Sequence, residues 1–180
     1  MALKLYNKKR DFTKTHEPKG VEAKSNGRRF VVQEHHASSL HFDFRLEIAG
    51  VMKSWAVPKG PSMNPKDKHL AVMTEDHPIE YNSFEGEILE GEYGAGEVRI
   101  WDSGTYEEIG DLPIETRLEE GKLTFILKGK KLKGEFHLVK MNNRGVKNWL
   151  LLKHQDEYAD PNWVLKPILH YGSRAQRRKA

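Results

Sequence analysis

The most regular alternation of apolar and polar residues along the chain runs from Leu40 to Ile48. The apolar positions are Leu40, Phe42, Phe44, Leu46 and Ile48, and the polar positions between them are His41, Asp43, Arg45 and Glu47. Strict period-two alternation predicts a half-buried β-strand, whose apolar face packs into a core and whose polar face points outward. Because residues two apart on a strand lie roughly 6.5–7 Å from each other, His41 and Asp43 can reach the same metal ion.

Alternation and turn signals along the whole chain predict about eight short strands, drawn from nine candidate segments. They fall at residues 29–34, 40–48, 51–57, 69–75, 97–101, 104–109, 122–128, 134–141 and 148–154. Asp102-Ser103 joins two of them, Ala49-Gly50 offers a two-residue hairpin turn, and Gly94-Ala95-Gly96 offers a tight corner. Pro113, early acidic residues and a stop at Gly121 predict a short helix at residues 113–120. This pattern favours an all-β, mainly antiparallel fold, either a barrel or a sandwich.

The chain of 180 residues shows no repeat and no domain boundary, and it is long enough for one domain with a core. We therefore expect a single domain over residues 1–180. Residues 1–28 lack periodicity and are expected to form an N-terminal arm. Residues 155–180 are expected to form a C-terminal extension whose basic end, Gly172 to Lys179, frays.

Composition narrows the choice of chemistry. Cysteine is absent, which excludes disulfides, thiolate catalysis and cysteine-ligated metals, so any metal must be held by histidine and carboxylate. No apolar run is long enough to span a bilayer and no secretory signal is evident, so we expect no membrane association and a cytoplasmic location. The net charge is +4, and basic clusters at residues 4–14 and 128–133 suit a polyanionic partner.

His35 lies just before the 40–48 strand and can supply a third ligand to a metal held by His41 and Asp43. Two imidazoles and one carboxylate suit a borderline-hard divalent ion and leave positions open for water and a phosphate oxygen. The simpler interpretation is a solvated outer strand face without function. The flanking motifs weigh against that interpretation.

Several motifs resemble, in order and at matching spacing, the 3′-phosphoesterase domain of bacterial DNA ligase D. They are Val32 to Glu47, Met52 to Pro61, Glu75-Asp76-His77-Pro78, Glu80-Tyr81, Phe84-Glu85-Gly86 and Gly91 to Gly96. The resemblance covers roughly residues 8–154. The sequence contains no polymerase or ligase segment, so we expect a stand-alone member of this family.

The resemblance implies an antiparallel β-barrel of about eight strands with short flanking helices. It also implies a manganese-dependent enzyme, with Co²⁺ or Zn²⁺ as alternative metals, that acts on DNA or RNA/DNA 3′ ends. Such an enzyme removes a 3′-phosphate or a 3′-terminal ribonucleoside and leaves a 3′-hydroxyl for repair. A DNA ligase, a polymerase or an end-binding repair protein acting in trans is the kind of partner that this activity suggests.

The resemblance carries over the metal ligands and the other active-site residues. The metal ligands are His35, His41 and Asp43, and the other positions are Arg10, Asp11, Glu17, Arg45, Lys59, His69, Glu75, His77 and Tyr81. We expect Arg45 to grip phosphate with two hydrogen bonds and Lys59 to act as a point charge. We expect His77 to stabilise the phosphoryl transition state or to protonate the leaving oxygen.

The remaining roles concern positioning. Asp11 and Glu17 are expected to hold the arm so that Arg10 reaches the site. Glu75, which shares the strand parity of His69, is expected to orient its neighbours.

The chain departs from the family pattern at three positions. His69 stands where an arginine that contacts phosphate is common, His36 where aspartate is common, and Phe42 where tyrosine is common. A histidine is charged only part of the time near neutral pH, so His69 changes the strength or the pH range of phosphate binding rather than the reaction class. Phe42 lies on the buried parity, where the change should be silent.

Two alternatives stay open. A non-haem iron oxygenase would combine His41 and Asp43 with a distant histidine such as His137. A non-catalytic nucleic-acid-binding barrel would need no metal. The other histidines, which are His16, His137, His154 and His170, are expected to be structural or to lie at the surface.

Overall fold

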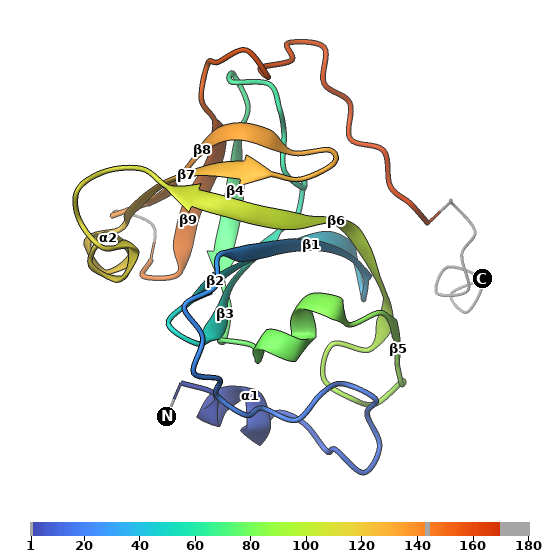
Figure 1. The fold of residues 1–180 in the computed structure, drawn as a ribbon. Coiled ribbons are helices and arrows are strands. Elements are labelled where there is room, and N and C mark those ends of the chain that lie inside the picture. Colours follow the sequence, from blue (N-terminus) through green and yellow to red (C-terminus); the bar gives the residue numbers. More distant parts are fainter. Residues whose placement is uncertain (1, 143–144, 170–180) are drawn as a thin grey trace.

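The computed structural model describes residues 2–142 and 145–169, so the basic end expected to fray lies outside the described residues (Figure 1). The elements in order are α1 (Lys4–Lys8), β1 (Arg29–His36), β2 (Leu40–Ile48), β3 (Val51–Val57), β4 (Lys68–Met73), the 3₁₀ helix η1 (Ile79–Ser83), β5 (Gly86–Ile88), β6 (Gly96–Glu108), α2 (Ile114–Glu120), β7 (Lys122–Lys128), β8 (Lys133–Lys140) and β9 (Asn148–Lys153). Among these elements no helix has the length and apolar character needed to cross a bilayer.

The strands form one antiparallel sheet that closes on itself. Its order is β1-β2-β3-β4-β9-β8-β7-β6-β5, and β1 also pairs with β6 from Arg29↔Thr105 to His36↔Glu97. This pairing closes a ring of eight strands and leaves β5 attached to the edge of β6, outside the ring. The expected all-β barrel with short flanking helices is therefore confirmed.

The barrel interior is built from the apolar parity of each strand. Phe42, Phe44, Leu46 and Ile48 of β2 are all at most 1% exposed and belong to one core cluster. Aromatic rings continue this core across the barrel, since Phe44 stacks on Phe125 at 5.9 Å between ring centroids. Each fully buried side chain of this size contributes about 1.5–3 kcal/mol to folding, so the alternation of β2 fixes its register in the ring.

The turn between β2 and β3 is the predicted two-residue hairpin. Ala49 has φ 52° and Gly50 has φ 81°, the pair of positive values that a type I′ turn requires. The predicted bounds of β2, β3 and β7 agree with the structure, and the predicted helix is α2, which ends at Gly121.

Two strand predictions were wrong. Residues 97–101 and 104–108 belong to one strand, β6, which runs through Asp102-Ser103 and ends at Glu108, one residue before the predicted end. Asp102 looked like a turn residue, but its carboxylate accepts hydrogen bonds from the backbone N–H groups of residues 130–132 in the next hairpin. Strand β4 ends at Met73 rather than at residue 75, so Glu75 does not share a strand face with His69.

The N-terminal arm contains a helix that the sequence did not predict. Helix α1 has only five residues and no side-chain cap, so its pattern is too short to be recognised. Leu3 and Tyr6 are buried against Val51 and Tyr81, and so the arm packs on the outer side of the barrel.

The outer face of β1–β3 is covered and not solvated. Asp43 is 7% exposed, Arg45 3% and Glu47 0%, although all three point away from the barrel core. The simpler interpretation of a solvated strand face is therefore wrong, because α1, η1 and the segments around them form a second layer over it (Figure 1).

The described part of the C-terminal extension is packed against the barrel. Trp163 and Leu165 contact the main core, and the Trp101 indole donates to the Lys166 carbonyl at 2.9 Å. The buried carboxylate of Glu34 then accepts hydrogen bonds from the backbone N–H groups of residues 168 and 169.

The β1–β6 pairing that closes the ring can be tested by a substitution at Gly96. Gly96 has φ 140°, and a Cβ there would lie 2.0 Å from the His36 carbonyl oxygen across the β1–β6 pairing. We expect Gly96→Ala to lower the free energy of unfolding by roughly 3 kcal/mol or more, because backbone strain and a clash with main-chain atoms add.

Gly91→Ala is the matched control for urea denaturation of the two variants. Gly91 also has a positive φ of 91°, but a Cβ there meets nothing within 4 Å. Its cost should be limited to the strain of a left-handed residue, about 1–2 kcal/mol. Equal losses in the two variants would contradict the importance of the β1–β6 contact.

Candidate active site

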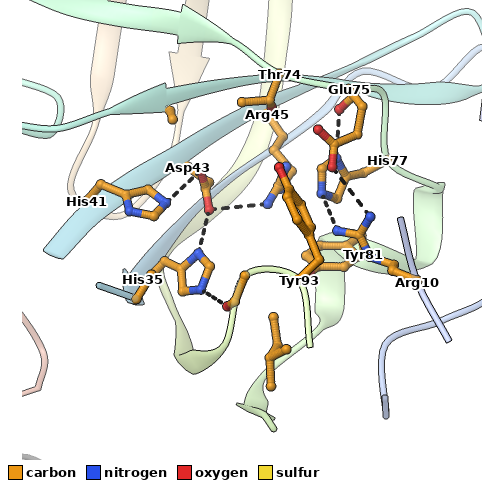
Figure 2. A pocket seen from close by; sticks show the side chains of 14 residues that line it. Arg10, His35, His41, Asp43, Arg45, Thr74, Glu75, His77, Tyr81 and Tyr93 are labelled. Carbon is orange, nitrogen blue, oxygen red and sulfur yellow. Dashed lines mark hydrogen bonds and ion pairs between the residues drawn. The ribbon is translucent and has the colours of Figure 1, made fainter. Parts of the chain in front are cut away.

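A pocket of about 300 Å³ lies on the outer side of the barrel (Figure 2). Its floor is the polar face of β1, β2 and β3, and its walls come from the arm, the β4–η1 segment and the β5–β6 turn. The lining residues are Arg10, His35, Ala37, His41, Asp43, Arg45, Ala56, Thr74, Glu75, His77, Tyr81, Ile88, Tyr93 and Gly94.

His35, His41 and Asp43 converge at one end of this pocket. Nδ1 of His35 lies 3.3 Å from Oδ2 of Asp43, and Nε2 of His41 lies 3.3 Å from Oδ1 of the same carboxylate. The pairing His35↔His41 in the β1–β2 register places the two imidazoles side by side, with ring centroids 4.7 Å apart. The three candidate ligand atoms lie within 4.8 Å of one another.

Each of these histidines has its other nitrogen next to a backbone carbonyl. Nε2 of His35 lies 2.6 Å from the Gly94 oxygen, and Nδ1 of His41 lies 3.3 Å from the Ser39 oxygen. A carbonyl only accepts, so these nitrogens carry protons. The nitrogens that face Asp43 donate to it when the ring is protonated and offer a lone pair to a metal when the ring is neutral. Carbonyl-held imidazoles of this kind are typical of metal ligands, and a cation between them and the carboxylate would satisfy all three groups. The donor set therefore fits a divalent metal ion.

Charge around Asp43 keeps it ionised. Burial alone would raise the pKa of the Asp43 carboxyl, but the Arg45 guanidinium and the hydrogen bonds from His35 and His41 hold that pKa well below its usual range. Burial would lower the pKa of His41, but the hydrogen bond to Asp43 and its negative charge raise it. The site thus presents a carboxylate at any pH near neutrality.

Arg45 lies in the middle of the pocket floor, and one nitrogen of its guanidinium lacks a hydrogen-bond partner among the described residues. Its Nε donates to Gln33 Oε1 at 2.8 Å, and its Nη2 lies 3.5 Å from Asp43 Oδ2. Its Nη1 is buried and has no hydrogen-bond partner within the described part of the chain. A buried guanidinium N–H left unpaired beside a pocket is poised to bind an anion.

His77 lies at the opposite end of the pocket, between two cationic groups. Its Nδ1 lies 2.9 Å from the Glu75 carbonyl oxygen, so its Nε2 faces Arg10 Nη2 at 3.5 Å as an acceptor. Burial, reinforced by the charges of Arg45 and Arg10, holds the pKa of His77 well below its usual value. A neutral His77 accepts a hydrogen bond from Arg10 and can position it, and the expected role of His77 in transition-state stabilisation or proton donation stays a prediction.

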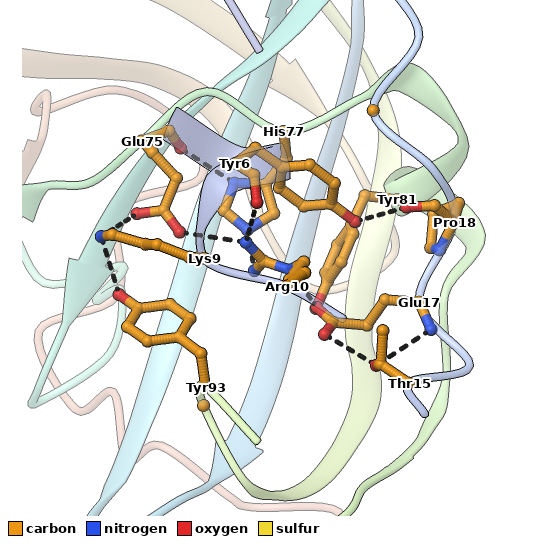
Figure 3. Close-up of polar contacts among 12 residues, drawn as sticks. Tyr6, Lys9, Arg10, Thr15, Glu17, Pro18, Glu75, His77, Tyr81 and Tyr93 are labelled. Carbon is orange, nitrogen blue, oxygen red and sulfur yellow. Dashed lines mark hydrogen bonds and ion pairs between the residues drawn. The ribbon is translucent and has the colours of Figure 1, made fainter. Parts of the chain in front are cut away.

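Glu17 joins the arm to the barrel (Figure 3). Its carboxylate accepts hydrogen bonds from Arg10 Nε at 2.9 Å, from the Tyr81 hydroxyl at 2.6 Å and from Thr15 Oγ1 at 2.9 Å. Arg10 also pairs with Glu75 at 3.4 Å and lies over the Tyr6 ring. Arg10 thus enters the pocket as a fixed group.

Glu17 and three other predicted site residues do not line the pocket. The Asp11 carboxylate is exposed and accepts hydrogen bonds from Thr13. Lys59 is exposed in the turn after β3; the pairing Phe42↔Val57 places that turn beside the start of β2, at the His41 end of the pocket. His69 Nδ1 lies 2.6 Å from the Gly60 carbonyl oxygen. Roles for these three residues remain predictions.

The sequence did not identify Gln33, which holds Arg45 but does not line the pocket, or Tyr93, which does line it. Gln33 positions Arg45 and shares the β1 face of His35, so period-two alternation along β1 was a usable signal. Tyr93 faces the arm. Its hydroxyl accepts a hydrogen bond from Lys9 Nζ at 3.3 Å, and its ring centroid lies 5.4 Å from the Arg10 guanidinium. The link from His35 to Gly94 depends on tertiary structure and had no local signal.

The non-haem iron alternative was wrong about His137. This residue lies on β8 beside Glu135 and close to His154, which follows β9, and it is absent from the pocket lining. His41 and Asp43 therefore have His35, and not His137, as their third neighbour.

A closed β-barrel that places two histidines, an aspartate and buried arginines in one pocket has the groups that a hydrolase of phosphate esters needs. The family model of the DNA ligase D 3′-phosphoesterase domain matches residues 33–140. The chain belongs to this family, whose class is that of phosphoesterases acting on DNA ends.

The chain is also similar to longer curated proteins named as multifunctional non-homologous end joining proteins LigD. It is 50% identical to that of Pseudomonas aeruginosa over 161 residues, covering 87% of this chain and 19% of the relative. It is 45% identical to the Mycobacterium tuberculosis protein, named as a DNA repair protein, with 86% and 20% covered. The Mycolicibacterium smegmatis protein is 43% identical, with 86% and 21% covered. The chain spans about a fifth of the length of these relatives.

The contacts of Glu17 predict that it holds the arm in place. We expect Glu17→Gln to lower the free energy of unfolding by about 3 kcal/mol, because it leaves the buried Arg10 without its closest countercharge. Limited trypsin digestion should also cut the arm faster. The matched control is Glu22→Gln, whose exposed carboxylate accepts from the Ala2 N–H and should cost under about 1 kcal/mol. Equal behaviour of the two variants would contradict the role of Glu17.

The burial of His77 predicts a pH dependence of stability. The pKa of His77 is lower in the folded state than in the unfolded chain. Below about pH 6.5 the unfolded chain therefore binds a proton that the folded state does not, and the free energy of unfolding decreases as the pH decreases. We expect His77→Gln to lose less stability than the wild type between pH 7.5 and pH 5.5 in urea titrations. The exposed His16 provides the control His16→Gln, which should keep the wild-type slope. An unchanged slope in His77→Gln would refute this assignment.

Proposed function

We propose that this domain is a manganese-dependent phosphoesterase that cleans the 3′ ends of DNA. It would hydrolyse a terminal 3′-phosphate and remove a 3′-terminal ribonucleoside from DNA or RNA/DNA ends, leaving a 3′-hydroxyl. The observation that carries the proposal is the meeting of a His₂Asp donor set and the unpaired Nη1 of Arg45 in one pocket.

The residues of the chain would divide the work by position. His35, His41 and Asp43 would hold the metal, and the carbonyls of Gly94 and Ser39 keep the two imidazoles oriented for it. Bound there, a divalent ion would neutralise phosphate charge and lower the pKa of a bound water.

Arg45 and Arg10 would stabilise the phosphoryl group. Arg45 offers its free Nη1 at the centre of the pocket, and Arg10 is held by Glu17, Glu75 and neutral His77. Both guanidiniums are fixed before substrate enters, and phosphoryl transfer depends mainly on such positioned charge.

Lys59 and His69 would act at the rim of the pocket. The turn that carries Lys59 lies at the His41 end, and His69 contacts the Gly60 carbonyl in that turn. We propose that Lys59 binds substrate phosphate as a point charge and that His69 positions its loop, in place of the arginine common in the family.

Partners in trans are proposed from the relatives. The curated relatives are named as non-homologous end joining proteins, so a DNA ligase, a polymerase or an end-binding repair protein is the partner class that would use the 3′-hydroxyl product.

A panel of defined 3′ ends tests the function. Strands ending in 3′-phosphate, in one ribonucleotide or in a plain deoxynucleotide would be incubated with Mn²⁺, Co²⁺, Zn²⁺ or Mg²⁺, and phosphate and shortened products measured. We expect turnover of the first two ends with Mn²⁺, and a loss of at least about 100-fold in His41→Ala and Asp43→Asn.

His16→Ala is the matched control, because this exposed histidine lies outside the pocket, and it should keep full turnover. Normal turnover in a folded His41→Ala protein would overturn the metal assignment. Tight strand binding without turnover under any metal would instead favour the non-catalytic barrel.

A further inference from the structure

A second group of metal-ligating side chains lies outside the pocket, on β8 and just beyond the end of β9. Nε2 of His137 and Nδ1 of His154 each lie 3.0 Å from the same oxygen, Oε2 of Glu135. The three candidate ligand atoms lie within 4.8 Å of one another. The two imidazole planes are nearly parallel, with an angle of 8° and centroids 5.4 Å apart.

The fold brings these three residues together on the outer face of the barrel. Glu135 and His137 are two apart on β8 and therefore point the same way. The β8–β9 register pairs His137 with Leu152, which puts His154, two residues further along, beside Glu135. Side-chain exposures of 24% for Glu135, 23% for His137 and 48% for His154 leave the group open to an ion from solvent.

A buried ion pair fixes the backbone on which two of the ligands sit. Lys153 Nζ, whose side chain is fully buried, pairs with Asp156 at 2.6 Å and also donates to the carbonyls of Glu135 and His154. The His154 N–H donates to the Glu135 carbonyl at 2.9 Å, and Asp156 accepts from the Glu135 N–H at 2.9 Å. Glu135 and His154 are thus held in register before any ligand binds.

We propose that Glu135, His137 and His154 form a second metal site, which binds zinc. Two imidazoles and a carboxylate are a ligand set that Zn²⁺ adopts with one position left to water. In tetrahedral zinc sites with ligand distances near 2.1 Å, the ligand atoms lie about 3.4 Å apart. Here the two imidazole nitrogens each lie 3.0 Å from Glu135 Oε2, and all three candidate ligand atoms lie within 4.8 Å of one another, so small side-chain movements would admit the ion.

The site is separate from the pocket. In the ring order, β8 lies four strands from β2 in either direction, through β3, β4 and β9 or through β1, β6 and β7, so the two faces are opposite (Figure 1). Bound zinc would join β8 to the point where the C-terminal segment leaves β9. Since the unfolded chain lacks this arrangement, zinc would stabilise the folded state.

Zinc titration calorimetry on tag-free protein tests the proposal, with the wild type, His154→Gln and His137→Gln compared. We expect each variant to bind one equivalent less than the wild type, or to bind the last equivalent at least about tenfold more weakly. His16→Gln removes an exposed histidine outside both groups and should match the wild type.

The test measures the difference in bound zinc between the wild type and each variant, so its outcome does not depend on whether the pocket also binds zinc. Loss of the pocket's equivalent in His41→Ala reports on the proposed function alone. Far-ultraviolet circular dichroism would verify folding of the variants, and zinc should raise the melting temperature of the wild type more than that of His154→Gln. Equal zinc stoichiometry and affinity in the wild type and a folded His154→Gln protein would overturn the second site.

Discussion

The charge pair between Asp43 and Arg45 on the outer face of β2 is the constraint on which the rest of the molecule depends. Both side chains are nearly excluded from solvent, and a charge removed from water is costly unless partners replace its hydration. Asp43 is compensated by two imidazoles and by Arg45, while Arg45 is held by Gln33. The layer formed by the arm and η1 excludes water from this face and makes its electrostatic interactions strong.

The layer that covers this face contains a second set of buried charges, which are also paired with one another. Arg10 lies between Glu17 and Glu75, and the Tyr81 hydroxyl donates to Glu17. A buried pair of this kind gives little net stability compared with apolar packing, but it fixes where a guanidinium points. The buried charges thus give less stability than apolar side chains would, but they are already oriented and would need no rearrangement to bind an anion.

Local sequence pattern predicted the parts of the fold that local forces determine. The bounds of β2 and the hairpin at Ala49-Gly50 follow from alternation and turn chemistry, and the family motifs brought His35, Arg10 and Tyr81 into one site. What failed depends on distant contacts. Asp102 continues a strand because another hairpin occupies its carboxylate, and the polar face of β2 is buried because segments more than 20 residues away in the chain lie over it. Neither contact produces a periodic pattern of apolar and polar residues in the sequence.

The pairing of β1 with β6 gives the barrel a seam, and that seam runs beside the proposed metal ligands. His35 lies on β1, opposite Val98 of β6, and the carbonyl that orients it belongs to Gly94, just before β6 begins. The ring becomes complete only after β1 has paired with β6 and β4 with β9, and pairings of such long sequence separation are slow to form. A barrel in which the β1–β6 seam has not formed, or has opened, would therefore lack an ordered site, so the proposed activity would depend on closure of this seam.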